Sequence, residues 1–150
     1  MTFNTRGVSA AATALVNDDG SLDVVFAVHR TSDDNYIAKS TLYPNSPVGW
    51  RSIPDHTFPT MGATDVVMED LDGDGFVDVV FAQEQDGTTF RVNSTLFWGS
   101  ANGWSSTPDV SFSTTGAPDA EAADVDGDAA RDPGVPACLG HRPSPRRAVL

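Results

Sequence analysis

The sequence predicts an all-β fold built from repeated four-stranded sheets. A short motif at residues 3–7 (FNTRG) returns at residues 58–62 (FPTMG) and at residues 112–116 (FSTTG), so it recurs after 55 and then 54 residues. The run DVVFA at residues 23–27 returns at residues 78–82, and its β-branched and aromatic residues are typical of strands. A period of this length indicates a protein assembled from stacked structural repeats.

Each repeat is expected to contain four short strands. In the most complete copy they fall near residues 66–69, 77–83, 94–98 and 111–114, with turn signals such as Asp86-Gly87 between them. The uninterrupted apolar run of the second strand predicts that both faces of its sheet are covered. Radially stacked blades cover both faces, so the sequence favours a partial β-propeller. A two-layer sandwich of the same strands is the alternative, although it gives no reason for three copies of one unit.

The loop at residues 70–78 (DLDGDGFVD) is the strongest candidate site. Four aspartates stand at loop positions 1, 3, 5 and 9, a spacing that lets carboxylate oxygens surround a hard cation, with Ca²⁺ the natural candidate. The carbonyl of Phe76 is the expected fifth ligand, and Gly75 stands where the loop must bend with a positive φ. An acidic turn without metal is the alternative. The four aspartates are Asp70, Asp72, Asp74 and Asp78.

An EF-hand is a second alternative for this loop. EF-hands place a bidentate Glu at position 12, where this loop has Phe81. The run at residues 79–82 is expected to form a buried strand instead of the exiting helix of an EF-hand. The sequence therefore favours a cation-binding loop that leads directly into a strand.

Three motifs together resemble the FG-GAP/VCBS repeat: F-x-T-x-G, the aspartate loop followed by VVFA, and STLFWGSANGW at residues 94–104. The resemblance covers residues 1–132 and implies an integrin-α-type β-propeller with calcium in the loop that joins two strands of a blade. It divides the chain into a first repeat at residues 1–57, a second at residues 58–111 and the start of a third at residues 112–132. The implied calcium ligands of the second repeat are Asp70, Asp72, Asp74, the Phe76 carbonyl and Asp78.

The same resemblance places two less complete loops in the other repeats. The third loop keeps four carboxylates but has Ala129 where the bend needs glycine, so weaker binding is expected. The first loop has Leu15 at its opening position, and a turn held by side-chain hydrogen bonds explains it as well as a metal site does. The corresponding residues are Asp124, Asp126, Asp128 and Asp132 in the third loop, and Asn17, Asp19, the Ser21 carbonyl and Asp23 in the first.

The composition restricts the partners of the protein. Its 150 residues carry a formal net charge of −12, which argues against binding to nucleic acid or to an anionic membrane and suits a surface that gathers divalent cations. No apolar run is long enough to span a membrane, and residues 1–14 lack the pattern of a secretory signal. Cys138 is the only cysteine, so an intrachain disulfide is excluded.

Two complete units and the opening of a third are too few to close a propeller ring. We therefore expect a piece of a longer protein that needs further blades or association. Residues 133–150 depart from the repeat, because arginine and proline replace the acidic residues, and are expected to form a disordered tail. Apolar side chains are expected to be exposed at the open ends, namely Val24, Val25, Phe26, Val79, Val80 and Phe81.

The sequence contains no recognised catalytic motif. His29, His56 and His141 lack the spacing of a metalloprotease, and no nucleophile-elbow motif occurs. The sequence therefore predicts a non-catalytic interaction or adhesion module, secreted or on the cell surface, whose protein or glycan ligand it does not specify. Metal-assisted hydrolysis at the aspartates, or a role as an accessory domain of a larger hydrolase, is one alternative. The other is a lectin-like propeller that stacks sugars on Trp50, Trp98 and Trp104.

Overall fold

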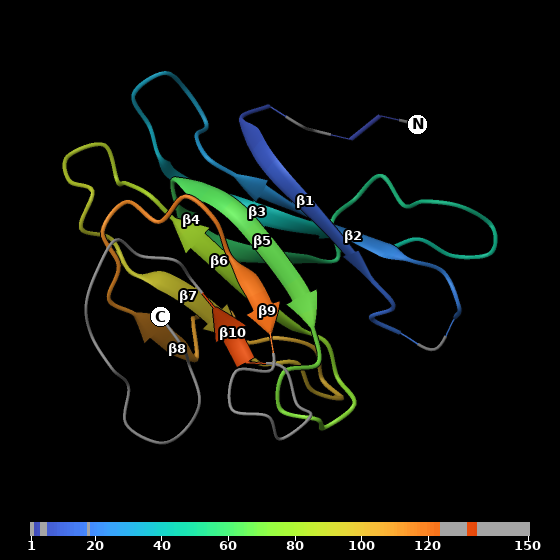
Figure 1. Cartoon of the computed structure of the whole chain (residues 1–150). Helices are drawn as coiled ribbons and strands as arrows, with labels where there is room; N and C mark the ends of the chain where they lie inside the picture. The colour runs from blue at the N-terminus through green and yellow to red at the C-terminus, as the bar shows by residue number, and fades with distance from the viewer. Residues whose placement is uncertain (1, 4–5, 18, 124–131, 135–150) are drawn as a thin grey trace.

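The computed structural model describes residues 2–3, 6–17, 19–123 and 132–134 of the chain (Figure 1). Within this part every regular element is a strand, which confirms the all-β prediction. The first antiparallel sheet contains β1 (Val8–Ala14), β2 (Asp23–Val28), β3 (Ile37–Tyr43) and β4 (His56–Met61). The second contains β5 (Ala63–Glu69), β6 (Asp78–Gln83), β7 (Ser94–Phe97) and β8 (Val110–Phe112), and a two-stranded sheet pairs β9 (Glu121–Ala123) with β10 (Asp132–Gly134).

The sheets repeat one pattern of strand pairing. Both four-stranded sheets follow the order of the chain, and the aspartate that opens β6 pairs with Glu69 just as Asp23 pairs with Ala14. Asp132 pairs with Ala123 in the same way at the start of the third copy. The first strands of consecutive copies lie near one another, β1 beside β5 and β5 beside β9 (Figure 1). This is the arrangement of neighbouring propeller blades, with the beginning of a third blade instead of a two-layer sandwich.

Stacking of the sheets buries β6 on both faces. Toward the first sheet, Val79 and Phe81 share an apolar cluster with Val25 and Leu42. Toward the third copy, Val80 joins a second cluster that includes Ala117 and Ala120. All six residues of β6 are buried, which explains why its central residues 79–82 are continuously apolar and do not alternate.

The expected exposure of the central strands is wrong. Val79, Val80 and Phe81 are at most 1% exposed, because β6 lies between the first sheet and the start of the third copy. Val24 and Val25 of the first sheet are also buried, and Phe26 is half-buried. On β1, the outward-facing Ala11 and Thr13 are accessible. Small side chains on this strand expose little apolar surface to water.

The phenylalanine of the F-x-T-x-G motif packs between blades. The ring of Phe58, carried by β4 of the first sheet, lies 5.3 Å from Phe81 and 5.0 Å from Phe97 of the second, centroid to centroid. Its third aromatic neighbour from the second blade is Trp104, at 5.8 Å. Phe3 makes the equivalent contacts one repeat earlier, with centroid distances of 5.5, 5.0 and 5.5 Å to Phe26, Tyr43 and Trp50. The motif therefore supplies one phenylalanine that packs on the aromatic side chains of each of the two blades.

The glycine of the motif joins one blade to the next. Gly62 has a φ of 55°, donates its N–H to the Tyr36 carbonyl at 2.8 Å and accepts from the Glu84 N–H at 2.9 Å. A Cβ atom at this position would lie 2.5 Å from the Gln85 carbonyl oxygen, so glycine is required for both its conformation and its close approach. The sheet boundary falls at this glycine, and the sequence repeat that begins at residue 58 therefore includes the last strand of the preceding sheet.

A hydroxyl near the start of each blade reinforces this joint. The Ser9 Oγ donates to the Ala63 carbonyl of the next blade at 2.6 Å, and the Thr64 Oγ1 donates to the Ala117 carbonyl at 2.7 Å. The two bonds join equivalent positions in consecutive copies. Each new blade is thus tied to its predecessor through backbone oxygens as well as through apolar contacts.

The start of the expected tail needs correction. Pro133 and Gly134 belong to β10 and pair with Ala122 and Glu121, so the strand continues past Asp132. Proline is compatible with β10 because this strand has one pairing partner in its two-stranded sheet, and proline is tolerated on edge strands. The expectation for residues 135–150 lies outside the described residues.

Replacing Gly62 by Ala should lower the free energy of unfolding by at least about 3 kcal/mol, since the new Cβ atom would collide with a backbone oxygen and occupy a strained φ. The matched control is Gly103→Ala, because Gly103 has a φ of 81° but nothing within 4 Å of its would-be Cβ. That variant should lose only about 1 to 2 kcal/mol from backbone strain. Urea unfolding of both variants measures the difference, and equal losses would contradict the blade-joint role of Gly62.

Candidate metal centre

The loop between β5 and β6 is shaped by its own carboxylates. Asp70 accepts the Gly73 N–H at 2.8 Å through Oδ1 and the Gly75 N–H at 2.9 Å through Oδ2. Asp72 accepts the Asp74 N–H at 3.1 Å, and Asp74 accepts the Phe76 N–H at 2.8 Å. The φ of Gly75 is 90°, as the sequence predicted, and Gly73 also has a positive φ of 76°. Successive turns of this kind draw the carboxylates toward one side of the loop.

Three of the predicted ligands come together. Oxygen atoms of Asp70, Asp72 and Asp78 lie within 4.8 Å of one another. Calcium binds oxygen at 2.3–2.6 Å, so ligands on opposite sides of one ion are about 5 Å apart and this spacing suits a shared Ca²⁺. Asp74 lies outside this group, with its carboxylate on the Phe76 N–H. The residues that fit a metal ion are therefore the first, second and last aspartates of the loop.

Asp78 also anchors the loop to the rest of the blade. It is 1% exposed, and its two oxygens accept the Leu71 N–H at 2.8 Å and the Gly99 N–H at 2.7 Å. Burial is the main cause that raises the pKa of Asp78 to about 6, and the nearby charges of Asp72 and Asp74 also raise it, while the two backbone hydrogen bonds act in the opposite direction. A cation beside these carboxylates would relieve this electrostatic cost.

This anchoring role recurs in the first blade and was missed by the sequence analysis. Asp23 is fully buried and accepts the Val16 N–H at 3.3 Å and the Asn45 N–H at 2.7 Å, as its counterpart Asp78 does. Burial is also the main cause that raises the pKa of Asp23. The aspartate before each VVFA run was the available signal. It marks a structural contact that exists even where the loop lacks a full set of carboxylates.

The first loop is a turn held by side-chain hydrogen bonds. The Asn17 Oδ1 accepts the Asp19 N–H at 2.9 Å, and the Asp19 Oδ1 accepts the Ser21 N–H at 2.8 Å. The Asn17 amide also donates to Asp23 at 3.3 Å, and Leu15 is 53% exposed at the opening position. Among the described residues, the second loop alone gathers three metal-type side chains. This geometry fits the metal-free alternative that the sequence left open for the first loop.

The third loop is described only at its end. Asp124, Asp126 and Asp128 lie outside the described residues. The backbone of Asp132 opens β10 in the register that Asp78 has in β6. The expected weaker site in this loop therefore stays a prediction.

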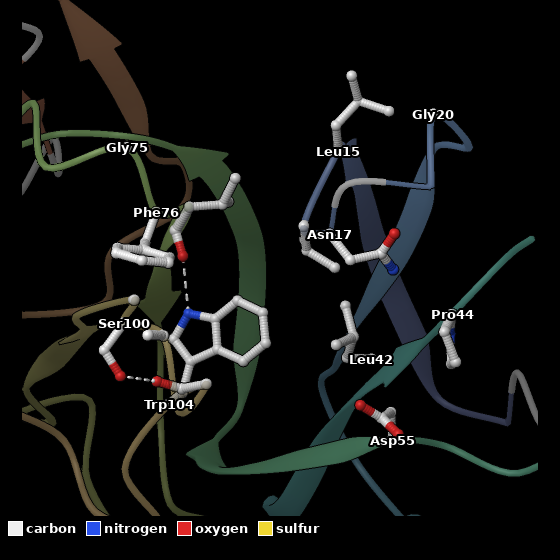
Figure 2. Close-up of a pocket in the computed structure, with 15 residues that line it drawn as sticks. Leu15, Asn17, Gly20, Leu42, Pro44, Asp55, Gly75, Phe76, Ser100 and Trp104 are labelled. Atoms are coloured by element: carbon white, nitrogen blue, oxygen red, sulfur yellow. Dashed lines mark hydrogen bonds between the residues drawn. The ribbon is translucent and has the colours of Figure 1, made fainter.

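A cleft of about 610 Å³ opens beside these loops, between the first two blades (Figure 2). One wall carries Leu15 and Leu42, and the opposite wall carries Phe76 and Trp104. The Trp104 indole donates to the Val77 carbonyl at 2.8 Å, and its ring packs against Phe58. Trp98 packs at the second apolar cluster, while Trp50 contacts Phe3 and is 38% exposed. The tryptophans thus take part in packing around the blades.

Comparison with known families agrees with this geometry. Residues 16–81 and residues 70–132 each match the FG-GAP-like repeat. The chain belongs to the FG-GAP-like repeat family. The first match begins in the first loop and ends in β6, and the second begins in the second loop and ends at the start of β10. Each family repeat therefore includes strands of two neighbouring sheets. No curated protein matches the chain.

FG-GAP repeats suggest a module of the integrin-α-like β-propeller kind, and the two antiparallel four-stranded sheets are consistent with blades of such a module. The family is generally non-catalytic, often binds calcium and is typical of extracellular proteins. In the part of the chain that the structure describes, no helix is long and apolar enough to cross a membrane.

The raised pKa of Asp78 predicts a pH dependence for the metal-free protein. Between about pH 4 and pH 6 the folded state holds a proton that the unfolded state has lost, so the free energy of unfolding should fall as the pH rises, by up to about 3 kcal/mol. Urea unfolding with a calcium chelator across this range measures the effect. Asp78→Asn should reduce the slope of the profile because its side chain does not titrate, and the raised pKa of Asp23 should account for part of the slope that is left. A wild-type stability that rises with pH in this window would contradict the prediction.

Proposed function

We propose that the protein is a calcium-stabilised β-propeller segment that serves as a non-catalytic interaction or adhesion module, secreted or at the cell surface. The observation that carries the proposal is the convergence of Asp70, Asp72 and Asp78 at the entry to β6. Asp74 and the Phe76 carbonyl are the further ligands expected from the loop pattern. A cation held there would link the loop to Asp78. This residue accepts a hydrogen bond from the Gly99 N–H, in the connection that follows β7.

A structural role for the ion has more support than a catalytic one. A catalytic metal keeps an open coordination position that faces a substrate pocket. Here one candidate ligand, Asp78, is buried and already bonded to two backbone N–H groups. The other two candidates shape the loop through hydrogen bonds to its backbone. These features favour an ion that stabilises the blade.

The outward face of the first sheet supports a need for further blades or association. Ala11 and Thr13 of β1 are exposed, whereas Val66, which corresponds to Ala11 in β5, is buried against the first blade. A second set of blades or another molecule would cover this face. The partner that the complete module binds is proposed to be a protein.

The glycan-binding alternative has less support. Sugar recognition needs an accessible aromatic face together with free polar groups. The Trp104 indole N–H is already bonded within the second blade, and Trp98 packs at an apolar cluster. Trp50 keeps an exposed portion but contacts Phe3 in the same way that Trp104 contacts Phe58. The repeated contact favours packing as the role of these positions.

Calcium should raise the thermal stability of the full chain, because a ligand that binds only the folded state stabilises it by about 2.7 kcal/mol at a hundredfold excess over Kd. Magnesium should have a much smaller effect, since it requires a tight octahedron and loses water reluctantly. Asp72→Asn should remove most of the calcium shift, while Asp19→Asn in the first loop should keep it. Identical melting curves with calcium and with chelator would refute the proposal.

Asp74→Ala should reduce calcium affinity more than Asp19→Ala does. The two residues are a matched pair, because each stands at loop position 5 and accepts one backbone N–H at 2.8 Å. They differ in their surroundings, since Asp74 adds negative charge beside the three-aspartate group. Isothermal titration with calcium gives the ranking. Equal losses of affinity would show that the two loops are equivalent.

A further inference from the structure

The two blades differ at one carboxylate beside the cleft. In the second blade, Asp109 accepts the Trp98 N–H at 2.9 Å. The first blade has Asp55 and Pro44 at these positions, and their backbones match, since the Asp55 N–H bonds to the Leu42 carbonyl as the Asp109 N–H bonds to that of Leu96. Proline has no N–H to donate. The Asp55 carboxylate is therefore left without the hydrogen bond that its counterpart makes.

Asp55 lines the cleft between the blades (Figure 2). It lies on the wall that carries Leu42 and Pro44, across from Trp104 and Phe76. Phe76 is 39% exposed, and Leu15 at the rim of the cleft is 53% exposed. The cleft thus offers apolar surface beside one exposed carboxylate and an aromatic wall across from it.

The other polar side chains of the cleft are already bonded. Asn17 accepts the Asp19 N–H and donates to Asp23. The Ser100 hydroxyl donates to the Gly103 carbonyl at 2.7 Å. Among the described residues that line the cleft, Asp55 is the one with a polar side chain that has no hydrogen-bond partner. A sugar would require several free donors and acceptors, whereas a single cation requires one free carboxylate.

Charge and shape together indicate the chemistry of the occupant. The sequence carries 21 acidic and nine basic residues, and the carboxylates of the neighbouring loops make this end of the molecule negative. Arg and Lys side chains combine an apolar stem with a cationic head, and the head is also attracted to aromatic faces such as that of Trp104. The volume of about 610 Å³ exceeds one side chain and suits a short peptide.

We propose that this cleft binds an exposed segment of a partner protein through an Arg or Lys side chain that pairs with Asp55, while an adjacent apolar residue packs between Leu15, Phe76 and Trp104. The inference rests on the proposed interaction role and names the chemistry of the partner. It does not depend on the identity of the metal in the loop. The cationic head lies at the Asp55 wall, and the apolar neighbour lies against the aromatic wall.

The test uses the full chain with excess calcium and a fluorescein-labelled peptide, Gly-Leu-Arg-Leu-Gly, followed by fluorescence polarisation. Asp55→Asn should weaken binding about two- to fivefold, the effect of removing one exposed ion pair. A peptide with citrulline in place of Arg keeps the shape and loses the charge, and it should bind as weakly to the wild type. Asp33→Asn, an exposed acid in the connection between β2 and β3, removes the same charge elsewhere and should leave binding unchanged.

Pro44→Ala gives a sharper test because it changes no charge. It restores an N–H group where Trp98 has one in the second blade, so Asp55 gains a competing hydrogen bond and peptide binding should weaken. Circular dichroism melts and calcium titrations of every variant report folding and the metal loop separately. Equal binding by Asp55→Asn or by the citrulline peptide, or no detectable peptide binding, would overturn this inference and leave calcium binding unaffected. Binding of chitotriose instead of the peptide would also overturn it, in favour of a glycan.

Discussion

The contact between neighbouring blades is the constraint on which the rest of the structure depends. β6 is apolar on both faces, so its sheet is stable only when another sheet covers each side. The F-x-T-x-G motif meets this need, since Phe58 fills the space between blades and Gly62 lets the chain pass close to the next one. The hydroxyl of Thr64 then bonds across the joint.

The loop at the entry to β6 depends on the same packing. Asp78 is held in place by backbone N–H groups from two connections, so its carboxylate is positioned before any ion arrives. The cost is electrostatic, because burial and two nearby carboxylates raise its pKa to about 6. Calcium would remove that cost at neutral pH and would stabilise the blade to which the aspartate is anchored.

The proposed binding sites of this chain lie where the copies differ. The blades share a backbone pattern and repeated aromatic contacts, so the aromatic positions that recur in both copies serve packing. Leu15 replaces the first aspartate of the loop, which leaves one blade with a hydrogen-bonded turn and the other with a candidate metal centre. Pro44 in place of a residue with an N–H group frees Asp55 at the cleft. Two substitutions thus give equivalent backbones different chemistry.

The sequence by itself determined the all-β fold, the repeat, the four strands of each blade and the aspartate loop with its bend at Gly75, because period, turn residues and β-branched runs are local properties of the chain. Only the tertiary structure decided which side chains are buried, since β6 is covered by segments far away in the sequence. For the same reason it alone showed that Asp78 bonds to Gly99, that Asp74 lies outside the three-aspartate group and that Asp55 faces a cleft. Those contacts join residues whose separation in the chain carries no periodic signal.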